Sequence, residues 1–230
     1  EVLNTDARKS FLTFEPLGVI GSIMPWNFPY WQALRFAAPC LMAGNVIVMK
    51  PSRVTMQSGI EIEKAFTESG IPDGIFQTVV GSVESANHLI DSDVNAVTFT
   101  GSTDAGAKVG QRAAMNLKKC VLELGGSDPF IVLDDAMIEK AAEGAVKGRF
   151  INCGQSCVAS KRFFVGKNIA KDFIELFIKK ASQLKVGDPT LIETDIGPLS
   201  SKGSLETISG IVEDAKEKGA EILLGGSEIE

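Results

Sequence analysis

The sequence predicts an α/β fold in which a parallel sheet covered by helices is followed by part of a second α/β domain. From Leu17 onward, short runs rich in β-branched residues alternate with longer amphipathic runs, which is typical of such a sheet. The paired glycines Gly125-Gly126 separate this alternation into two sets, and consecutive glycines allow a sharp crossing between layers. We therefore expect a domain boundary near Gly125.

Each set has its own expected elements. In the first set we expect strands at 18–24, 45–49, 76–80, 95–100 and 120–122, and helices at 30–42, 55–69, 83–90 and 104–116. Gly44 and Gly70 fall where two of these helices stop, a common place for glycine. In the second set we expect strands at 130–133, 162–165 and 221–224, helices at 137–150, 170–184 and 201–218, and a long polar loop at 187–203.

Composition and charge narrow the class of protein. The chain has 230 residues, a net charge of −6 and no long basic stretch, which argues against nucleic acid and anionic membranes as partners and favours small molecules. Arg35 interrupts the longest apolar stretch, so no stretch reaches the roughly 18 to 20 apolar residues of a membrane span.

The cysteine and histidine content argues against two kinds of structural site. Four dispersed cysteines are too few for a disulfide scaffold, and one histidine gives poor zinc ligation. We expect a cytoplasmic location and no metal.

Three polar residues are candidates for catalysis. Cys157 follows the polar run 152–156, which we expect to be an exposed turn entering a helix whose N–H groups stabilise a thiolate. Glu123 ends an apolar run at the carboxyl edge of the predicted sheet, where a partly buried carboxylate can act as a general base. Asn27 is either a turn-forming residue or a fixed N–H donor. The more isolated thiols, Cys40 and Cys120, are expected to be buried and inert.

Two further segments suggest a nucleotide site, although the chain has no Gly-x-Gly-x-x-Gly fingerprint. The strand expected at 95–100 runs into Gly101-Ser102 and then a helix, which places small residues and N–H groups where a pyrophosphate can dock. A glycine turn without a ligand is the alternative. Lys50 ends another expected strand, so its ammonium should project from the carboxyl edge of the sheet, with a solvated lysine as the alternative.

Five segments in this order resemble the aldehyde dehydrogenase family. They are Pro25-Trp26-Asn27-Phe28-Pro29, Lys50-Pro51-Ser52, Phe99-Thr100-Gly101-Ser102-Thr103, Glu123-Leu124-Gly125-Gly126 and the run 150–157 that ends in Cys157. The resemblance implies a segment of an oligomerisation arm over 1–16, a Rossmann-like NAD(P)-binding domain over 17–125 and a catalytic domain over 126–230. It also implies a homo-oligomer, either a dimer or a tetramer.

The resemblance implies covalent catalysis by Cys157. Attack on an aldehyde would give a thiohemiacetal, departure of a hydride would give a thioester, and water would release a carboxylic acid. In this family the glutamate at Glu123 acts as the general base for hydrolysis. The side chain of Asn27, with the backbone N–H of Cys157, would form the oxyanion hole.

For the cofactor, the resemblance implies NAD or NADP. Lys50 would bind the adenosine ribose, and the Gly101-Ser102 turn would bind the pyrophosphate. Where NAD-preferring members commonly carry a glutamate, this chain has Arg53. Because Ser52 and Arg53 offer a hydroxyl and a positive fork to a 2′-phosphate, we predict that NADP is accepted. The other expected cofactor positions are Ile23, Trp26, Gly81, Gly106 and Leu124.

For the substrate, the motifs at 25–32 and 123–130 most resemble the branch that oxidises succinate semialdehyde. The resemblance places Trp31 and Arg35 at the substrate, with Arg35 paired to its distal carboxylate. A buried arginine needs an anionic partner, and substrate, Glu123 and another protein carboxylate are all candidates. Two departures stand out: Ile151 replaces a second arginine of some members, with Arg149 offset by two, and Ala159 replaces the cysteine of a redox pair.

The resemblance covers nearly the whole chain, but the chain resembles only the central part of a family member. Two rival hypotheses therefore remain beside aldehyde oxidation to the acid. One is an acylating enzyme that releases the thioester to coenzyme A. The other is an inactive piece that binds nucleotide or only assembles.

Overall fold

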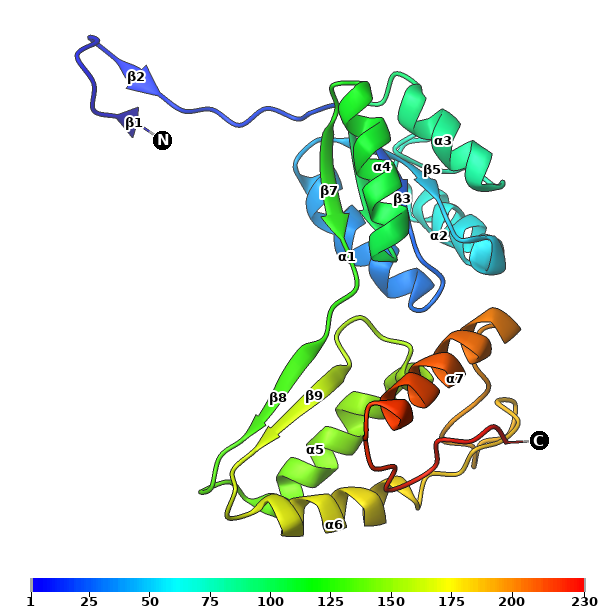
Figure 1. Ribbon diagram of the computed structural model, residues 1–230. Helices are drawn as coiled ribbons and strands as arrows, with labels where there is room; N and C mark the ends of the chain where they lie inside the picture. The colour runs from blue at the N-terminus through cyan, green and yellow to red at the C-terminus, as the bar shows by residue number, and fades with distance from the viewer. Residues whose placement is uncertain (1, 230) are drawn as a thin grey trace. The chain divides into compact units, whose positions relative to one another are not determined.

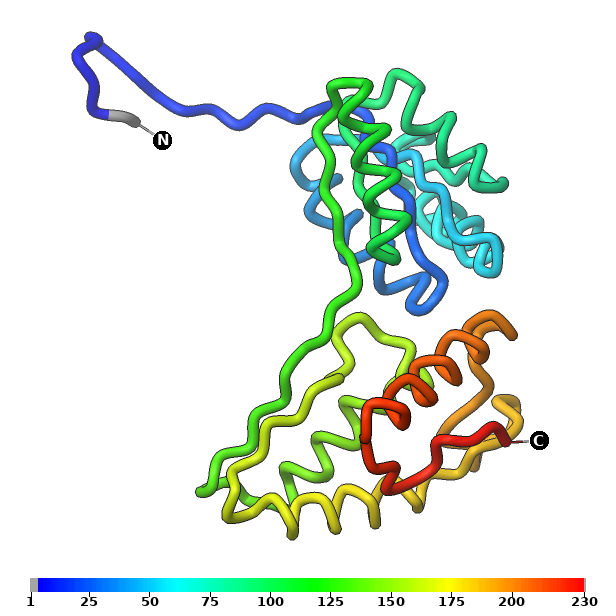
Figure 2. The backbone as a smooth tube through the Cα atoms, viewed as in Figure 1, coloured from blue at the N-terminus to red at the C-terminus, as the bar shows by residue number. Residues whose placement is uncertain are grey.

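The computed structural model describes residues 2–229, and it divides the chain into two compact units with the boundary between Gly125 and Gly126. Figure 1 shows the helices and strands of both units, and Figure 2 traces the backbone through them. The α/β fold expected from the sequence is confirmed. Each unit is described by itself.

The first unit is built on a five-stranded parallel sheet with the order β5-β4-β3-β6-β7. Its strands are β3 (Val19–Ile23), β4 (Val46–Lys50), β5 (Phe76–Thr78), β6 (Ala96–Thr100) and β7 (Lys119–Glu123). The chain proceeds from β3 outward to β5 and then returns to the other side of β3. The strand order therefore reverses between β3 and β6, and open parallel sheets bind ligands beyond the carboxyl ends of the strands at such a point.

Two pairs of helices cover this sheet. Helices α1 (Pro29–Met42) and α2 (Met56–Glu68) pack together with β4 and β5 around Ile47 and Met49. Helices α3 (Val83–Asp91) and α4 (Thr103–Met115) pack together with β3 and β6 around Val97 and Phe99. The short 3-10 helix η1 (Arg53–Thr55) precedes α2.

Helix α1 approaches the sheet closely because it presents small side chains to it. Ala33 and Ala37 lie one turn apart on this helix, and both are fully buried.

Strand β7 is an edge of the five-stranded sheet, and in the described part of the chain it pairs only with β6. Most of its residues are exposed, including Val121 at 59%. The apolar run that predicted a strand here therefore does not mark a buried strand within this unit. Before the sheet, β1 (Val2–Leu3) pairs antiparallel with β2 (Ser10–Phe11). The arm predicted at 1–16 begins at Glu1, which lies outside the described residues.

The second unit contains the parallel pair β8 (Asp128–Val132) and β9 (Ser160–Val165). Helix α5 (Ile138–Phe150) and the 3-10 helix η2 (Ile151–Gly154) connect the two strands, and α6 (Ala170–Ala181) and α7 (Lys202–Glu217) follow. Tilted and edge-on ring contacts among Phe163, Phe173 and Phe177 join β9 to α6. Together with Val132 and Ala145, they form the core of this unit.

Truncating Phe173 tests this core. Phe173 is only 3% exposed, so Phe173→Ala should lower the free energy of unfolding of the second unit by about 3–5 kcal/mol. The neighbouring Ile174 is 41% exposed, and Ile174→Ala should cost about 1 kcal/mol or less. Urea unfolding followed by circular dichroism measures both. Equal losses for the two variants would contradict the assignment of Phe173 to the core.

All but one of the expected elements are present, and their ends differ from the expected ones by at most three residues. The strand predicted at 221–224 is wrong: these residues form neither helix nor strand. A strand needs a partner for its backbone groups, whereas Ile222 and Leu224 instead line an apolar pocket with Phe177 of α6. None of the helices in residues 2–229 has the length and apolar character needed to cross a bilayer.

Candidate active site

The carboxyl edge of the sheet gathers four of the predicted site residues of the first unit. In the strand register, Ile23 lies opposite both Lys50 and Phe99, and Thr100 lies opposite Glu123. The backbone N–H of Gly101 donates to the Glu123 carbonyl at 3.0 Å. Ile23, Lys50, Gly101 and Glu123 therefore share one edge, as strand ends predicted for the last three.

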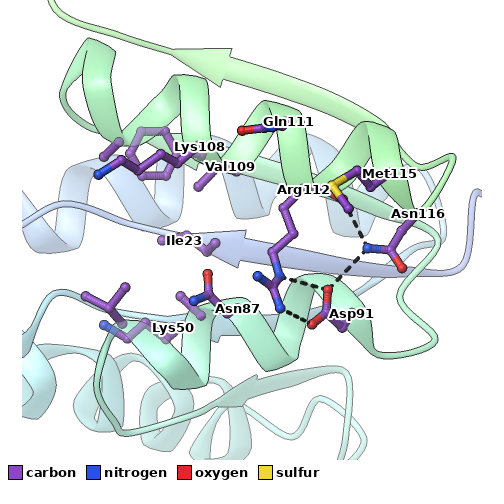
Figure 3. Close-up of a pocket in the computed structure, with 14 residues that line it drawn as sticks. Ile23, Lys50, Asn87, Asp91, Lys108, Val109, Gln111, Arg112, Met115 and Asn116 are labelled. Carbon is purple, nitrogen blue, oxygen red and sulfur yellow. Dashed lines mark hydrogen bonds and ion pairs between the residues drawn. The ribbon is translucent and has the colours of Figure 1, made fainter.

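A pocket of about 730 Å³ lies between α3 and α4 (Figure 3). Ile23 and Phe99 contribute apolar surface from the sheet, and Ala86 and Val109 contribute it from the two helices. Lys50 and Lys108 lie toward one end of the pocket, and Asp91, Arg112 and Asn116 lie toward the other. An apolar slot with cations at one end suits a flat heteroaromatic group that carries anionic substituents.

Lys50 is buried at the end of β4, with 6% of its surface exposed. Burial lowers the pKa of its ammonium, and the nearby positive charge of Arg53 lowers this pKa further. The alternative of a solvated lysine is thus excluded. A polar or anionic ligand would offset the cost of burying the charged ammonium. Lys50 is therefore suited to bind the polar part of a nucleotide.

The Gly101-Ser102 turn leads into α4, and small residues there let the helix start close to the end of β7. The Ser102 hydroxyl caps α4 by accepting from the Ala105 N–H at 3.3 Å. A Cβ added at Gly106 would lie 2.3 Å from Leu124 Cδ2, so a larger residue here would have to displace the Leu124 side chain. Asp104 lies in the first turn of α4, where its charge would oppose a bound anion.

The other predicted cofactor residues lie outside the lining of this pocket. Ser52 is half-buried and its carbonyl accepts from the Thr55 N–H, while Arg53 is exposed in η1. Gly81 precedes α3, and a Cβ there would collide with Ser85 Oγ at 2.0 Å. Trp26 is half-buried in the turn before α1. Of the predicted cofactor set, the pocket brings together Ile23 and Lys50.

A bidentate ion pair joins the two helices that form the walls of the pocket (Figure 3). Arg112 Nε and Nη2 donate to the two Asp91 carboxylate oxygens at 2.8 and 2.5 Å, and Asn116 Nδ2 donates to Asp91 Oδ1 at 3.2 Å. The hydrogen bond from Arg112 is the main cause that lowers the pKa of Asp91, and the same bond raises the pKa of Arg112. Sequence reasoning missed these residues, since they come from two different helices.

This ion pair predicts a pH dependence of stability. Because the folded pKa of Asp91 lies below its ordinary value of 3.8, the charged pair stabilises the fold above that value. This stabilisation is lost as the pH falls through the lowered folded pKa. Urea unfolding from pH 7 to pH 2.5 should show wild type more stable than Asp91→Asn at neutral pH, with the difference shrinking only below about pH 4. A difference that already disappears at pH 6 would rule out Asp91 as its source.

The remaining predicted residues of the first unit lie in or near α1 and at the end of β7. Asn27 is half-buried in the turn before α1, and Trp31 is exposed. Arg35 is exposed and donates from Nη2 to Gln32 Oε1 at 3.1 Å. Arg35 is therefore not the buried cation that the sequence led us to expect, and its pairing with an anionic substrate stays a prediction. Glu123 is also exposed, so its expected partial burial is not observed.

The cysteines of the first unit behave as expected for inert thiols. Cys40 and Cys120 are both partly buried. Desolvation raises the pKa of each thiol. Since the thiolate is the nucleophile, a raised pKa makes both residues poor nucleophiles at neutral pH.

In the second unit, residues 152–159 form the Cys157 loop, which leads directly into strand β9. The prediction that Cys157 enters a helix is wrong, so the thiol does not lie at a helix N-terminus. Asn152, Cys153 and Gly154 are consecutive left-handed residues, with φ of 51°, 57° and 73°. The positive φ of Gly154 favours glycine, and a Cβ there would also lie 3.3 Å from the Arg149 carbonyl oxygen. Cys157 itself is half-buried.

Two cations hold the backbone of the Cys157 loop. Arg149 Nη2 donates to the Gly154 carbonyl at 3.2 Å, and its Nη1 donates to the Ser160 carbonyl at 3.4 Å. Lys161 Nζ donates to the carbonyls of three loop residues: Ser156 at 3.3 Å, Cys157 at 3.1 Å and Ala159 at 3.2 Å. Burial lowers the pKa of Arg149. The sequence assigned no role to either cation, although both flank the loop.

Comparison with known proteins now identifies the family. The model of the aldehyde dehydrogenase family matches residues 1–230. A Synechocystis protein named probable succinate-semialdehyde dehydrogenase (NADP(+)) is 47% identical over 231 residues, which are 100% of this chain and 51% of the relative. A Mycobacterium tuberculosis protein named succinate-semialdehyde dehydrogenase (NADP(+)) 1 is 46% identical over 227 residues, which are 97% of this chain and 49% of the relative.

Solved structures agree with the sequence comparison. The crystal structure of an E. coli NADP-dependent enzyme has a TM-score of 0.94 at 35% identity, and the match covers 100% of this chain and 49% of that enzyme. The chain spans about half the length of the curated relatives it matches. Because the family model matches its whole length, the chain belongs to the aldehyde dehydrogenase family.

Proposed function

We propose that this chain carries the central part of an enzyme that oxidises succinate semialdehyde to succinate, with NADP as the preferred cofactor. The observation that carries the proposal is the half-buried thiol of Cys157 in a loop whose backbone is held by Arg149 and Lys161. Such a loop can present a nucleophile in one orientation, as covalent catalysis requires. The names of the curated relatives support the choice of aldehyde and cofactor.

The proposed reaction uses three side chains in separate roles. The Cys157 sulfur bonds to the aldehyde carbon, and N–H donors of Asn27 and of the Cys157 backbone stabilise the oxygen that becomes negative. Loss of a hydride from that carbon leaves a thioester. Glu123 takes a proton from water, the resulting hydroxide attacks the thioester carbon, and cleavage of the C–S bond releases the carboxylate and restores the thiol. A bound nicotinamide supplies the hydride acceptor.

The first unit supports a nucleotide cofactor. Its pocket between α3 and α4 has apolar walls and the buried ammonium of Lys50, and this combination fits an adenosine group. We propose that the Gly101-Ser102 turn binds the pyrophosphate and that Ser52 and the exposed Arg53 bind a 2′-phosphate. A carboxylate in place of Arg53 would repel that phosphate, so the sequence favours NADP over NAD. Cytoplasmic location and assembly as a dimer or tetramer stay predictions.

The substrate assignment depends on a carboxylate far from the reacting aldehyde. The exposed guanidinium of Arg35 donates one N–H to Gln32, and its other N–H groups can donate to a carboxylate. We propose that Arg35 pairs with the distal carboxylate of succinate semialdehyde and that Trp31 contacts its methylene groups. An uncharged aldehyde of the same length would lose this pairing.

The test of this function is a stopped-flow absorbance trace of reduced nicotinamide. The full chain is mixed with succinate semialdehyde and NADP, then with NAD, and n-butanal replaces the aldehyde as an uncharged control. A burst with succinate semialdehyde that is faster with NADP than with NAD supports the proposal. Equal bursts with n-butanal would exclude recognition of the distal carboxylate.

Cofactor titration by fluorescence distinguishes the rival hypotheses. NADP binding without any burst would favour a nucleotide-binding piece, a possibility that arises because the chain spans about half of its relatives. A burst followed by turnover only when coenzyme A is added would favour the acylating enzyme. Turnover in water alone supports the hydrolytic role proposed for Glu123.

A further inference from the structure

We propose that Lys161 is a positioning residue that aims the backbone N–H of Cys157 at the developing oxyanion. This inference rests on the proposed function, because it deepens the role of the same loop. Lys161 lies four residues after the nucleophile, at the start of β9. Its side chain folds back over the Cys157 loop, where Nζ donates to backbone carbonyls.

The contacts of Lys161 match the chemistry of an ammonium group. A lysine ammonium has three N–H donors, and Nζ lies within 3.3 Å of the carbonyl oxygens of Ser156, Cys157 and Ala159. All three acceptors belong to the Cys157 loop. One side chain therefore holds the backbone on both sides of the nucleophile.

The planarity of the peptide bond links this contact to catalysis. The Ser156 carbonyl and the Cys157 N–H belong to the same peptide plane, and in a trans peptide they point in opposite directions. By holding the Ser156 carbonyl, Lys161 fixes the direction in which the Cys157 N–H points. The positive charge at that carbonyl also polarises the amide and strengthens its N–H as a donor. Fixed donors of this kind stabilise an oxyanion most effectively.

Burial anchors the same segment from its other side. The side chains of Ser156 and Ala159 are buried, while Lys161 itself is exposed. Arg149 holds the carbonyls of Gly154 and Ser160, which flank the segment. Lys161 is thus the group that controls the central peptide, and its removal leaves the hydrophobic core of the unit intact.

Hydrogen exchange tests the structural part of this proposal without requiring activity. In Lys161→Met, exchange in the peptide covering 152–160 should rise about tenfold, with core peptides unchanged. Lys161→Arg should show a smaller rise, because it keeps the charge but presents a planar fork to three convergent carbonyls. The exposed Lys167 supplies the matched control, and Lys167→Met should exchange like wild type. Unchanged exchange of the loop in Lys161→Met overturns the proposal.

Burst kinetics test the catalytic part. The burst rate constant should fall about tenfold or more in Lys161→Met and less in Lys161→Arg, while the aldehyde concentration at half-saturation stays within about twofold. A loss that appears only as weaker aldehyde binding, or one equal in both variants, overturns the positioning role. If wild type shows no burst, the proposed function fails, and the exchange experiment alone decides whether Lys161 orders the loop.

Discussion

Replacing Cys157 with alanine is expected to abolish the burst of reduced nicotinamide and to lower turnover by about 10⁴-fold or more. Without the sulfur, no covalent bond to the aldehyde carbon can form, and hydride transfer loses its tetrahedral precursor. The loop should keep its conformation, because Lys161 and Arg149 bind backbone carbonyls and not the thiol. Stopped-flow absorbance measures the burst, and a fluorescence titration should show unchanged cofactor affinity.

Cys153 provides the matched control for this experiment, since it lies four residues earlier in the same loop and is also partly buried. Alanine retains the Cβ of cysteine, so Cys153→Ala should preserve the left-handed backbone at this position. We expect a burst of ordinary amplitude in Cys153→Ala. If Cys153→Ala loses the burst and Cys157→Ala keeps it, the nucleophile has been assigned to the wrong cysteine.

Replacing Glu123 with glutamine is expected to separate the two halves of the reaction. The amide keeps the size of the side chain but cannot take a proton from water, so the thioester should form and then persist. The burst should survive, and steady-state turnover should fall by about 10²–10⁴-fold, which is the usual contribution of a general base. Mass spectrometry of the acid-quenched protein should then show a stable acyl adduct on Cys157.

The exposed Glu68, at the end of α2, gives a control of the same chemical type. Glu68→Gln should retain both the burst and the turnover. Loss of the burst in Glu123→Gln would instead assign Glu123 to activation of the thiol, and full turnover in that variant would remove it from the mechanism. The burst therefore tests the role proposed for Cys157, and steady-state turnover tests the role proposed for Glu123.

The elements of the fold were largely predictable because their signals are local. Apolar strands such as β4 end at a charged residue, Lys50, and glycines such as Gly44 and Gly70 adopt the left-handed backbone that ends a helix. The prediction failed at 221–224, where the residues have the composition of a strand but no partner strand. Local composition does not reveal whether a partner is available.

Parts of the candidate site depend on contacts that no local pattern encodes. The Asp91–Arg112 pair joins residues 21 positions apart, and Lys161 acts through backbone carbonyls, which every residue possesses. The burial of Lys50 also depends on how α3 and α4 pack. By contrast, Cys157 and Glu123 were identified through motifs. Motifs can therefore nominate candidate residues for the chemistry, whereas the contacts that support those residues need the folded structure.

The run of three left-handed residues at the start of the Cys157 loop has a consequence for protein engineering. A β-branched residue at position 152, 153 or 154 would be strained by the left-handed backbone alone, independently of any effect on aldehyde binding or catalysis. In a saturation library of this loop, many inactive members at these positions would have lost the conformation of the loop and not a catalytic group. Activity screens of such a library therefore need a folding readout before they can be used to map the chemistry.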